Sequence, residues 1–191
     1  MVSALKWLIS NYEKMNIRIL NISVGMLASA RREEQEELLA AIEAVWDAGI
    51  VVVAAAGNNG PKDKSITIPG LCRKIITVGS SDDEEGEVKN LGLMRGYSGR
   101  GPTEACIMKP EVVAPGTAIV SCKRMGNGYE MKSGTSMATP VVAGAVAVLL
   151  SRYSNLKPAE VKLRLYETSV DTGKSKHAQG WGRLDVMQLI R

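Results

Sequence analysis

The chain has 191 residues, of which 45% are hydrophobic and 23% are charged. This length and this balance predict one globular domain with a substantial core, and they exclude a disordered or fibrous protein. The formal net charge is only +4, and the basic residues are scattered among acidic ones. Nucleic acid is therefore not an expected partner.

The three cysteines, Cys72, Cys106 and Cys122, lack the paired spacing of a zinc or redox site. We interpret them as small buried residues of a protein in a reducing compartment. The apolar run over residues 141–150 has ten residues, too few to cross a bilayer. No secretion signal follows Met1. We therefore expect a cytoplasmic location and no membrane partner.

The first half of the chain alternates helical and strand patterns. Apolar residues three and four positions apart predict a helix over residues 2–14 and a second helix over 31–48. Three short apolar segments are predicted as buried strands: 16–23, 50–56 and 74–79. Strands that alternate with helices are typical of an α/β fold with three layers, a mostly parallel sheet flanked by helices on both faces.

The second half contains more turns. Residues 110–116 are predicted as a short strand bounded by prolines, and residues 118–123 and 129–132 as a hairpin. Three helices are expected after it: an apolar one that follows Ser136, one from Pro158 to about Ser169, and one from Asp185 after a loop over 171–182.

Residues 82–87 are strongly acidic, which could suggest a calcium loop. They lack the fixed alternation of ligands in an EF-hand. We therefore interpret this stretch as a solvated turn. No metal site is assigned to it.

Ser136 stands where a tight turn passes into a helix. Unpaired backbone N–H groups and the helix dipole would stabilise an oxyanion beside it. The serine is thus a candidate nucleophile, although serine is also a common N-cap residue. Asn58, in the polar turn 57–60, offers the neutral N–H donor that an oxyanion requires. Both turns are predicted at the carboxyl edge of the sheet, so we expect the two side chains to lie close together.

Four blocks of the sequence, residues 21–25, 54–58, 109–116 and 134–140, stand out together. In sequence and in order they resemble the subtilisin-like serine proteases (peptidase S8), and in detail the bacterial intracellular type. The resemblance implies that Ser136 is the nucleophile and Asn58 the oxyanion-hole donor of an endopeptidase. It also implies a polypeptide substrate whose side chain before the scissile bond enters an apolar pocket with two walls, formed by Ser23, Val24 and Gly25 and by Ala55, Ala56 and Gly57.

The family's catalytic aspartate and histidine lie in Asp-Thr/Ser-Gly and His-Gly-Thr blocks, and neither block is present. The resemblance therefore implies that residues 1–191 are the C-terminal part of a single, N-terminally truncated subtilisin-like domain. The sole histidine, His177, is interpreted as a loop residue. Without a base a serine is a weak nucleophile, so we expect the chain alone to be nearly inert.

Two alternatives stay open. The chain could be a non-catalytic, peptide-binding pseudoprotease. It could also be an esterase of the α/β-hydrolase type, because Ser136, Asp171 and His177 follow the chain order of that class.

Truncation implies an exposed apolar sheet edge or face. The chain would use it to bind the missing N-terminal part of the domain or to self-associate. The resemblance implies no confident cofactor for this chain, since the family's strong calcium site draws largely on the missing part. Calcium is an expectation for the intact domain only.

Overall fold

The computed structural model describes residues 1–26, 31–84 and 95–191. Its central sheet is parallel and has the strand order β1-β2-β3-β4. The four strands are Ile19–Ile22, Val51–Ala55, Ile76–Ser80 and Val112–Ala114. A separate antiparallel pair joins β5 (Ile119–Cys122) to β6 (Tyr129–Lys132). The expected α/β class is confirmed.

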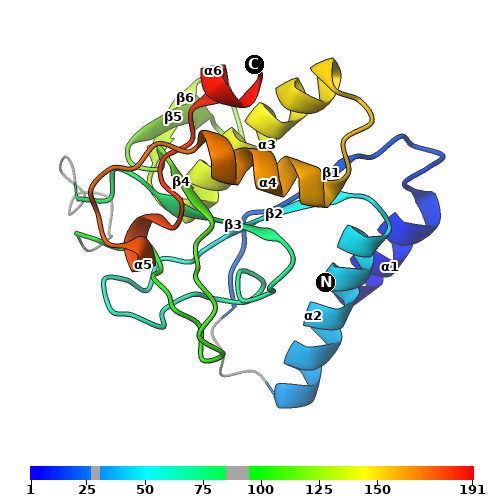
Figure 1. Ribbon diagram of the computed structural model, residues 1–191, viewed down its shortest axis with the longest axis horizontal. Helices are drawn as coiled ribbons and strands as arrows, with labels where there is room; N and C mark the ends of the chain where they lie inside the picture. Colours follow the sequence, from blue (N-terminus) through cyan, green and yellow to red (C-terminus); the bar gives the residue numbers. More distant parts are fainter. Residues whose placement is uncertain (27–30, 85–94) are drawn as a thin grey trace.

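Six helices occur in the described part of the chain: α1 (Val2–Asn11), α2 (Arg32–Asp47), α3 (Thr135–Arg152), α4 (Pro158–Thr168), α5 (Lys176–Gln179) and α6 (Val186–Leu189). Helix α3 packs along all four strands of the sheet, whereas α1 and α2 pack against each other and α2 contacts β2. Figure 1 shows α1 and α2 together on one side of the sheet and α3 on the other. Every residue of β2 and β3 is buried, as expected of central strands covered on both faces.

Three elements differ from the sequence prediction. Strand β1 is shorter than the predicted 16–23, because Asn16 adopts a positive φ of 52° and ends a turn instead of beginning a strand. The predicted loop 171–182 contains α5, a single helical turn too short to show a periodic pattern. Helix α3 extends beyond the ten-residue apolar run at both ends, and its 18 residues are long and apolar enough by composition to cross a membrane. Eight of its residues are buried, several of them in the hydrophobic core, so it is the core helix of this fold.

The two edges of the sheet differ. Beside β4, the N–H of Val113 donates to the carbonyl of Gly182 (3.0 Å), and the N–H of Leu184 donates to the carbonyl of Val113 (2.9 Å). The C-terminal segment therefore closes that edge. In the described part of the chain, β1 has no strand on its outer side. Ile19 and Leu20 are only partly buried and Asn21 is exposed, whereas Ile22 is buried.

Helix α3 also carries an apolar stripe that faces away from the sheet. Its members recur three and four positions apart and are all exposed: Pro140, Val141, Gly144, Ala147 and Val148. Val148 is 47% exposed, although it lies one residue before the buried Leu149. Among the described residues, therefore, nothing pairs with the outer edge of β1 and nothing covers the apolar stripe of α3.

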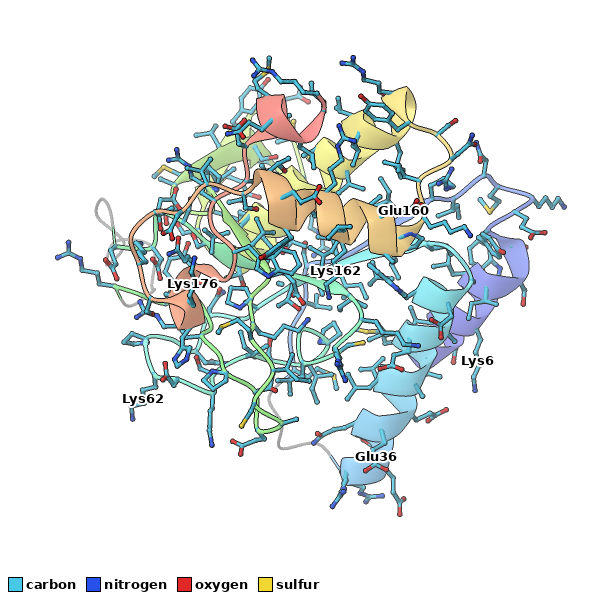
Figure 2. All side chains as sticks on the ribbon, viewed as in Figure 1. Lys6, Glu36, Lys62, Glu160, Lys162 and Lys176 are labelled. Carbon is cyan, nitrogen blue, oxygen red and sulfur yellow. The ribbon has the colours of Figure 1, made fainter. Side chains whose placement is uncertain are left out.

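A buried charge network joins β3 and the segment just before β4 to α4. Lys109 is fully buried, and its Nζ lies 2.7 Å from Glu111 Oε1 and 3.0 Å from Thr77 Oγ1. Lys162 of α4, labelled in Figure 2, places its Nζ 2.9 Å from the same Glu111 oxygen. Burial lowers the pKa of Lys109, and the Glu111 carboxylate opposes this shift. One buried carboxylate therefore holds two ammonium groups.

Candidate active site

Ser136 is the second residue of α3, and the N-cap position belongs to Gly134. Gly134 has a φ of 148°, and a Cβ atom there would lie 3.1 Å from Asn58 Nδ2. The backbone conformation therefore favours glycine, and a side chain there would also press on Asn58. The interpretation of Ser136 as the cap itself is wrong. Its backbone N–H belongs to the first helical turn, where such groups have no partner within the helix.

The carboxamide of Asn58 is held in one orientation. Its Oδ1 accepts hydrogen bonds from the Thr135 N–H and from Thr135 Oγ1, each 3.0 Å long. A backbone N–H can only donate, so the atom facing it must be the amide oxygen. Thr135 Oγ1 in turn accepts from the N–H of Gly57 (3.1 Å). The Nδ2 group of Asn58 is thereby left available as a donor, the role expected of it.

A cavity of about 230 Å³ brings most of the predicted site residues together. Its lining is Gly25, Ala55, Gly57, Asn58, Asn59, Thr67, Thr135 and Ser136. Three predicted wall residues do not line it. Ala56 is fully buried, Val24 is 55% exposed, and Ser23 meets Ser136 through its backbone carbonyl. The nucleophile candidate and the oxyanion-donor candidate thus share one cavity.

Thr67 is a lining residue that the sequence did not reveal. Its side chain stands against the Cα atoms of Gly25 and Gly57, where any Cβ would collide with it. The Thr67 N–H donates to the carbonyl of Ala56 (2.9 Å), which fixes it between the two walls. The small wall residues alone led us to expect room for a bulky apolar group. Thr67 takes up part of that room, and no motif or periodicity marks it.

The hydroxyl of Ser136 donates to the backbone carbonyl of Ser23, with a distance of 2.7 Å. The sole histidine lies elsewhere: His177 Nδ1 is 3.0 Å from Asp63 Oδ2. Asp171 instead accepts hydrogen bonds from the Gly173 N–H and the Gln179 amide and pairs with Lys176. Asp171 and His177 therefore do not form the pair that an esterase would need.

The hydrogen bond from the Gly173 N–H, followed by those from Gln179 and Lys176, lowers the pKa of Asp171 to about 2. Each of these donors stabilises the ionised carboxylate. The charged carboxylate of Asp171 thus stabilises the loop that precedes α5 through these contacts.

The acidic stretch that could have suggested calcium is partly described. Asp82 Oδ1 accepts from the N–H groups of Gly116 (2.9 Å) and Thr117 (3.1 Å), so this carboxylate fastens the turn after β4. Residues 85–87 lie outside the described residues. Within the described ranges, no group of three or more His, Cys, Asp or Glu side chains is arranged to hold a metal ion.

Comparison with known proteins gives a consistent result. The model of the subtilase family (peptidase S8) matches residues 1–182. The chain is 38% identical to the serine protease AprX of Bacillus subtilis (strain 168), over 87% of this chain and 40% of AprX. It is 33% identical to subtilisin DY of Bacillus licheniformis, over 97% of this chain and 60% of that protein.

Solved structures agree with these matches. Sphericase superposes with a TM-score of 0.78 at 25% identity, over 96% of this chain and 63% of its own. The prenylagaramide maturation protease PagA superposes with a TM-score of 0.76 at 25% identity, over 100% of this chain and 67% of its own. The chain spans less than two thirds of the length of the two curated relatives named above. The chain belongs to the subtilase family of serine peptidases.

Proposed function

We propose that this chain carries the nucleophile and the oxyanion donor of a serine endopeptidase that cleaves polypeptides. The supporting observation is that Ser136 and the oriented Asn58 line one cavity at the start of α3. Ser136 Oγ would attack the carbonyl carbon of a peptide bond. The oxyanion formed would then receive hydrogen bonds from Asn58 Nδ2 and from the backbone N–H of Ser136.

The base that activates Ser136 is proposed to come from a polypeptide segment outside these 191 residues. The Ser136 hydroxyl donates to a backbone carbonyl, which is too weak a base to remove its proton, and the sole histidine pairs with Asp63. In subtilisin, a member of the family, loss of the histidine lowers turnover about 10⁶-fold, a value that belongs to that enzyme. The open edge of β1 and the apolar stripe of α3 are the surfaces such a segment would cover.

The substrate pocket is proposed to prefer a small side chain before the scissile bond. Thr67 stands between Gly25 and Gly57, the two walls of the cavity. A side chain no larger than that of alanine or serine fits beside it more easily than a leucine or phenylalanine. The preference therefore follows from one threonine rather than from the walls.

A second candidate function is a non-catalytic module that binds peptides. The hydrogen bond from Ser136 to Ser23 favours it, since the hydroxyl is engaged with the backbone and has no activating partner in the cavity lining. The cavity and the open edge of β1 would still bind an extended peptide.

Complementation separates the two functions. Peptide hydrolysis is measured with the chain alone and with an added N-terminal fragment of AprX that carries the family's aspartate and histidine blocks. We expect hydrolysis only in the mixture, and none with Ser136→Ala, while the control Ser151→Ala on exposed α3 surface keeps it. A stable mixture that binds peptide without hydrolysing it would favour the binding module.

We further propose a reducing, cytoplasmic location, which rests on three free thiols. Cys72 is buried, whereas Cys106 and Cys122 are exposed rather than buried as expected. Alkylation of the protein from intact cells, read by mass spectrometry, is expected to find all three unpaired. We assign no cofactor to these residues, and calcium is a proposal only for the complete domain.

A further inference from the structure

The antiparallel pair β5–β6 and its turn form a ribbon, residues 119–132, with two unlike faces. Val120 lies opposite Met131, and Cys122 lies opposite Tyr129. Alternate residues of a strand share a face, so these four side chains form one apolar face. Val120 is 64% exposed and Tyr129 70% exposed. At the turn, Met125 is 81% exposed, which extends the apolar surface to the tip of the ribbon.

Two cations stand beside this face. Lys123 and Arg124 are exposed at the turn, and neither has an ion pair with a described residue. The third basic residue of the ribbon, Lys132, is neutralised by Glu130 at 2.8 Å. The tip of the ribbon thus combines apolar side chains with two uncompensated positive charges.

The ribbon is continuous with the candidate active site. A cavity of about 190 Å³ lies between the ribbon and Met137, the residue after the proposed nucleophile. Its other lining residues come from the ribbon: Ile119, Ser121, Cys122, Glu130 and Lys132. Beyond β6, Ser133 Oγ accepts a hydrogen bond from the N–H of Ala118 (2.8 Å), which fastens both ends of the ribbon to each other. Two residues later the chain enters α3. A polypeptide bound at Ser136 therefore has the ribbon as a neighbour.

We propose that the apolar face and the basic turn of the ribbon bind the polypeptide substrate away from the scissile bond, and select a segment in which apolar and acidic residues alternate. The proposal rests on the proposed function and names the substrate class more closely. An extended peptide that lies alongside the ribbon as a further strand places alternate side chains on its two faces. Its apolar side chains can then meet Val120 or Met131, while its carboxylates lie on the other face, within reach of Lys123 and Arg124 at the turn.

The observations favour a short peptide over other occupants. A stable protein–protein interface buries about 800 Å² on each partner, more than five side chains on a narrow ribbon supply. An anionic membrane would also suit apolar and basic side chains. Only a polypeptide substrate, however, also accounts for the continuity of the ribbon with Ser136.

The test uses a fluorescein-labelled peptide, Gly-Leu-Glu-Leu-Glu-Leu-Glu-Gly, and measures its fluorescence anisotropy with the full chain. We expect saturable binding that weakens about tenfold in Lys123→Glu/Arg124→Glu and in Val120→Ser/Met131→Ser. The control Lys14→Glu/Met15→Ser changes one exposed cation and one exposed apolar residue in the turn that follows α1, and it is expected to bind normally. Peptides with lysine for glutamate, or serine for leucine, are expected to bind weakly.

Equal binding by the wild type and both ribbon variants would overturn the proposal. So would ribbon-dependent sedimentation with phosphatidylserine vesicles in the absence of peptide binding, since it would identify a membrane as the partner. Ser136→Ala is expected to bind the peptide normally. Failure of the ribbon proposal is thereby distinguishable from failure of the protease proposal, which rests on hydrolysis that depends on Ser136.

Discussion

The two edges of the central sheet differ in whether a neighbouring segment pairs with them. At β4, the segment around Gly182 supplies backbone hydrogen bonds, and all three residues of the strand are buried. At β1, the outer side has no described strand, and the residue just beyond it, Ser23, holds the hydroxyl of Ser136. The closed edge is stabilised by contacts within the chain. The open edge lies beside the proposed nucleophile, so under the proposed function the reaction takes place at the edge that a further polypeptide segment would cover.

Among variants at the closed edge, the largest effect on stability is expected from Glu111→Gln. The substitution leaves the fully buried Lys109 ammonium without a counter-charge, whereas Lys162 is 20% exposed and can turn to solvent. An uncompensated buried charge costs about 3–5 kcal/mol, and denaturant unfolding measures the loss.

The loss of stability in Lys109→Met can be compared directly with that in Glu111→Gln. Lys162 still neutralises Glu111 after the change, so the loss of stability is expected to be clearly smaller than for Glu111→Gln. Equal losses would contradict the idea that the carboxylate is shared between two lysines.

The difference between the edges also marks what could be predicted from sequence. The continuous apolar run at residues 50–56 and the turns after it placed Asn58 near Ser136, because the carboxyl ends of parallel strands meet at one edge. Thr67 and the shared Glu111 escaped prediction. Each matters through contacts with residues that are distant in sequence, such as Thr67 with Gly25 and Glu111 with Lys162, and such contacts leave no periodic pattern.

At the open edge, the largest effect on activity is expected from Asn58→Ala in the complemented enzyme. Loss of one oxyanion-hole donor in subtilisin costs about 10²–10³ in kcat, and we expect a similar loss here with little change in KM. The control is Asn11→Ala, on α1. A normal kcat in Asn58→Ala would remove this residue from the oxyanion hole.

Thr67→Gly is expected to change substrate preference rather than rate. Removing the side chain between Gly25 and Gly57 enlarges the cavity, and one methylene in a pocket is worth about 10–200-fold in discrimination. The ratio of kcat/KM for leucine over alanine before the scissile bond is therefore expected to rise at least about tenfold. For Thr67→Ser, which removes only the methyl group, this ratio is expected to lie between those of the wild type and Thr67→Gly. An unchanged ratio in both variants would mean that the substrate side chain does not reach Thr67.

The two faces of α3 allow the same comparison within one helix. Val148→Lys lies on the exposed stripe, and its free energy of unfolding is expected to stay within about 0.5 kcal/mol of the wild type. The variant is also expected to self-associate less in sedimentation velocity, because a charge interrupts the apolar surface. Val146→Lys, at a fully buried position of the same helix, is expected to prevent stable folding. If both variants were equally damaging, the stripe would be core rather than open surface.

The smallest effect is expected in the loop that leads to the closed edge, from Asp171→Asn. The folded-state pKa of Asp171, about 2, lies below the ordinary value of 3.8, so the unfolded chain binds the proton first as the pH falls. The contribution of this carboxylate is present above about pH 4 and is lost towards pH 2. An asparagine oxygen can still accept from Gly173 but carries no charge for Lys176. The denaturation midpoint of the variant is therefore expected to fall less steeply over that range, and identical slopes would show that Asp171 does not link this loop to pH.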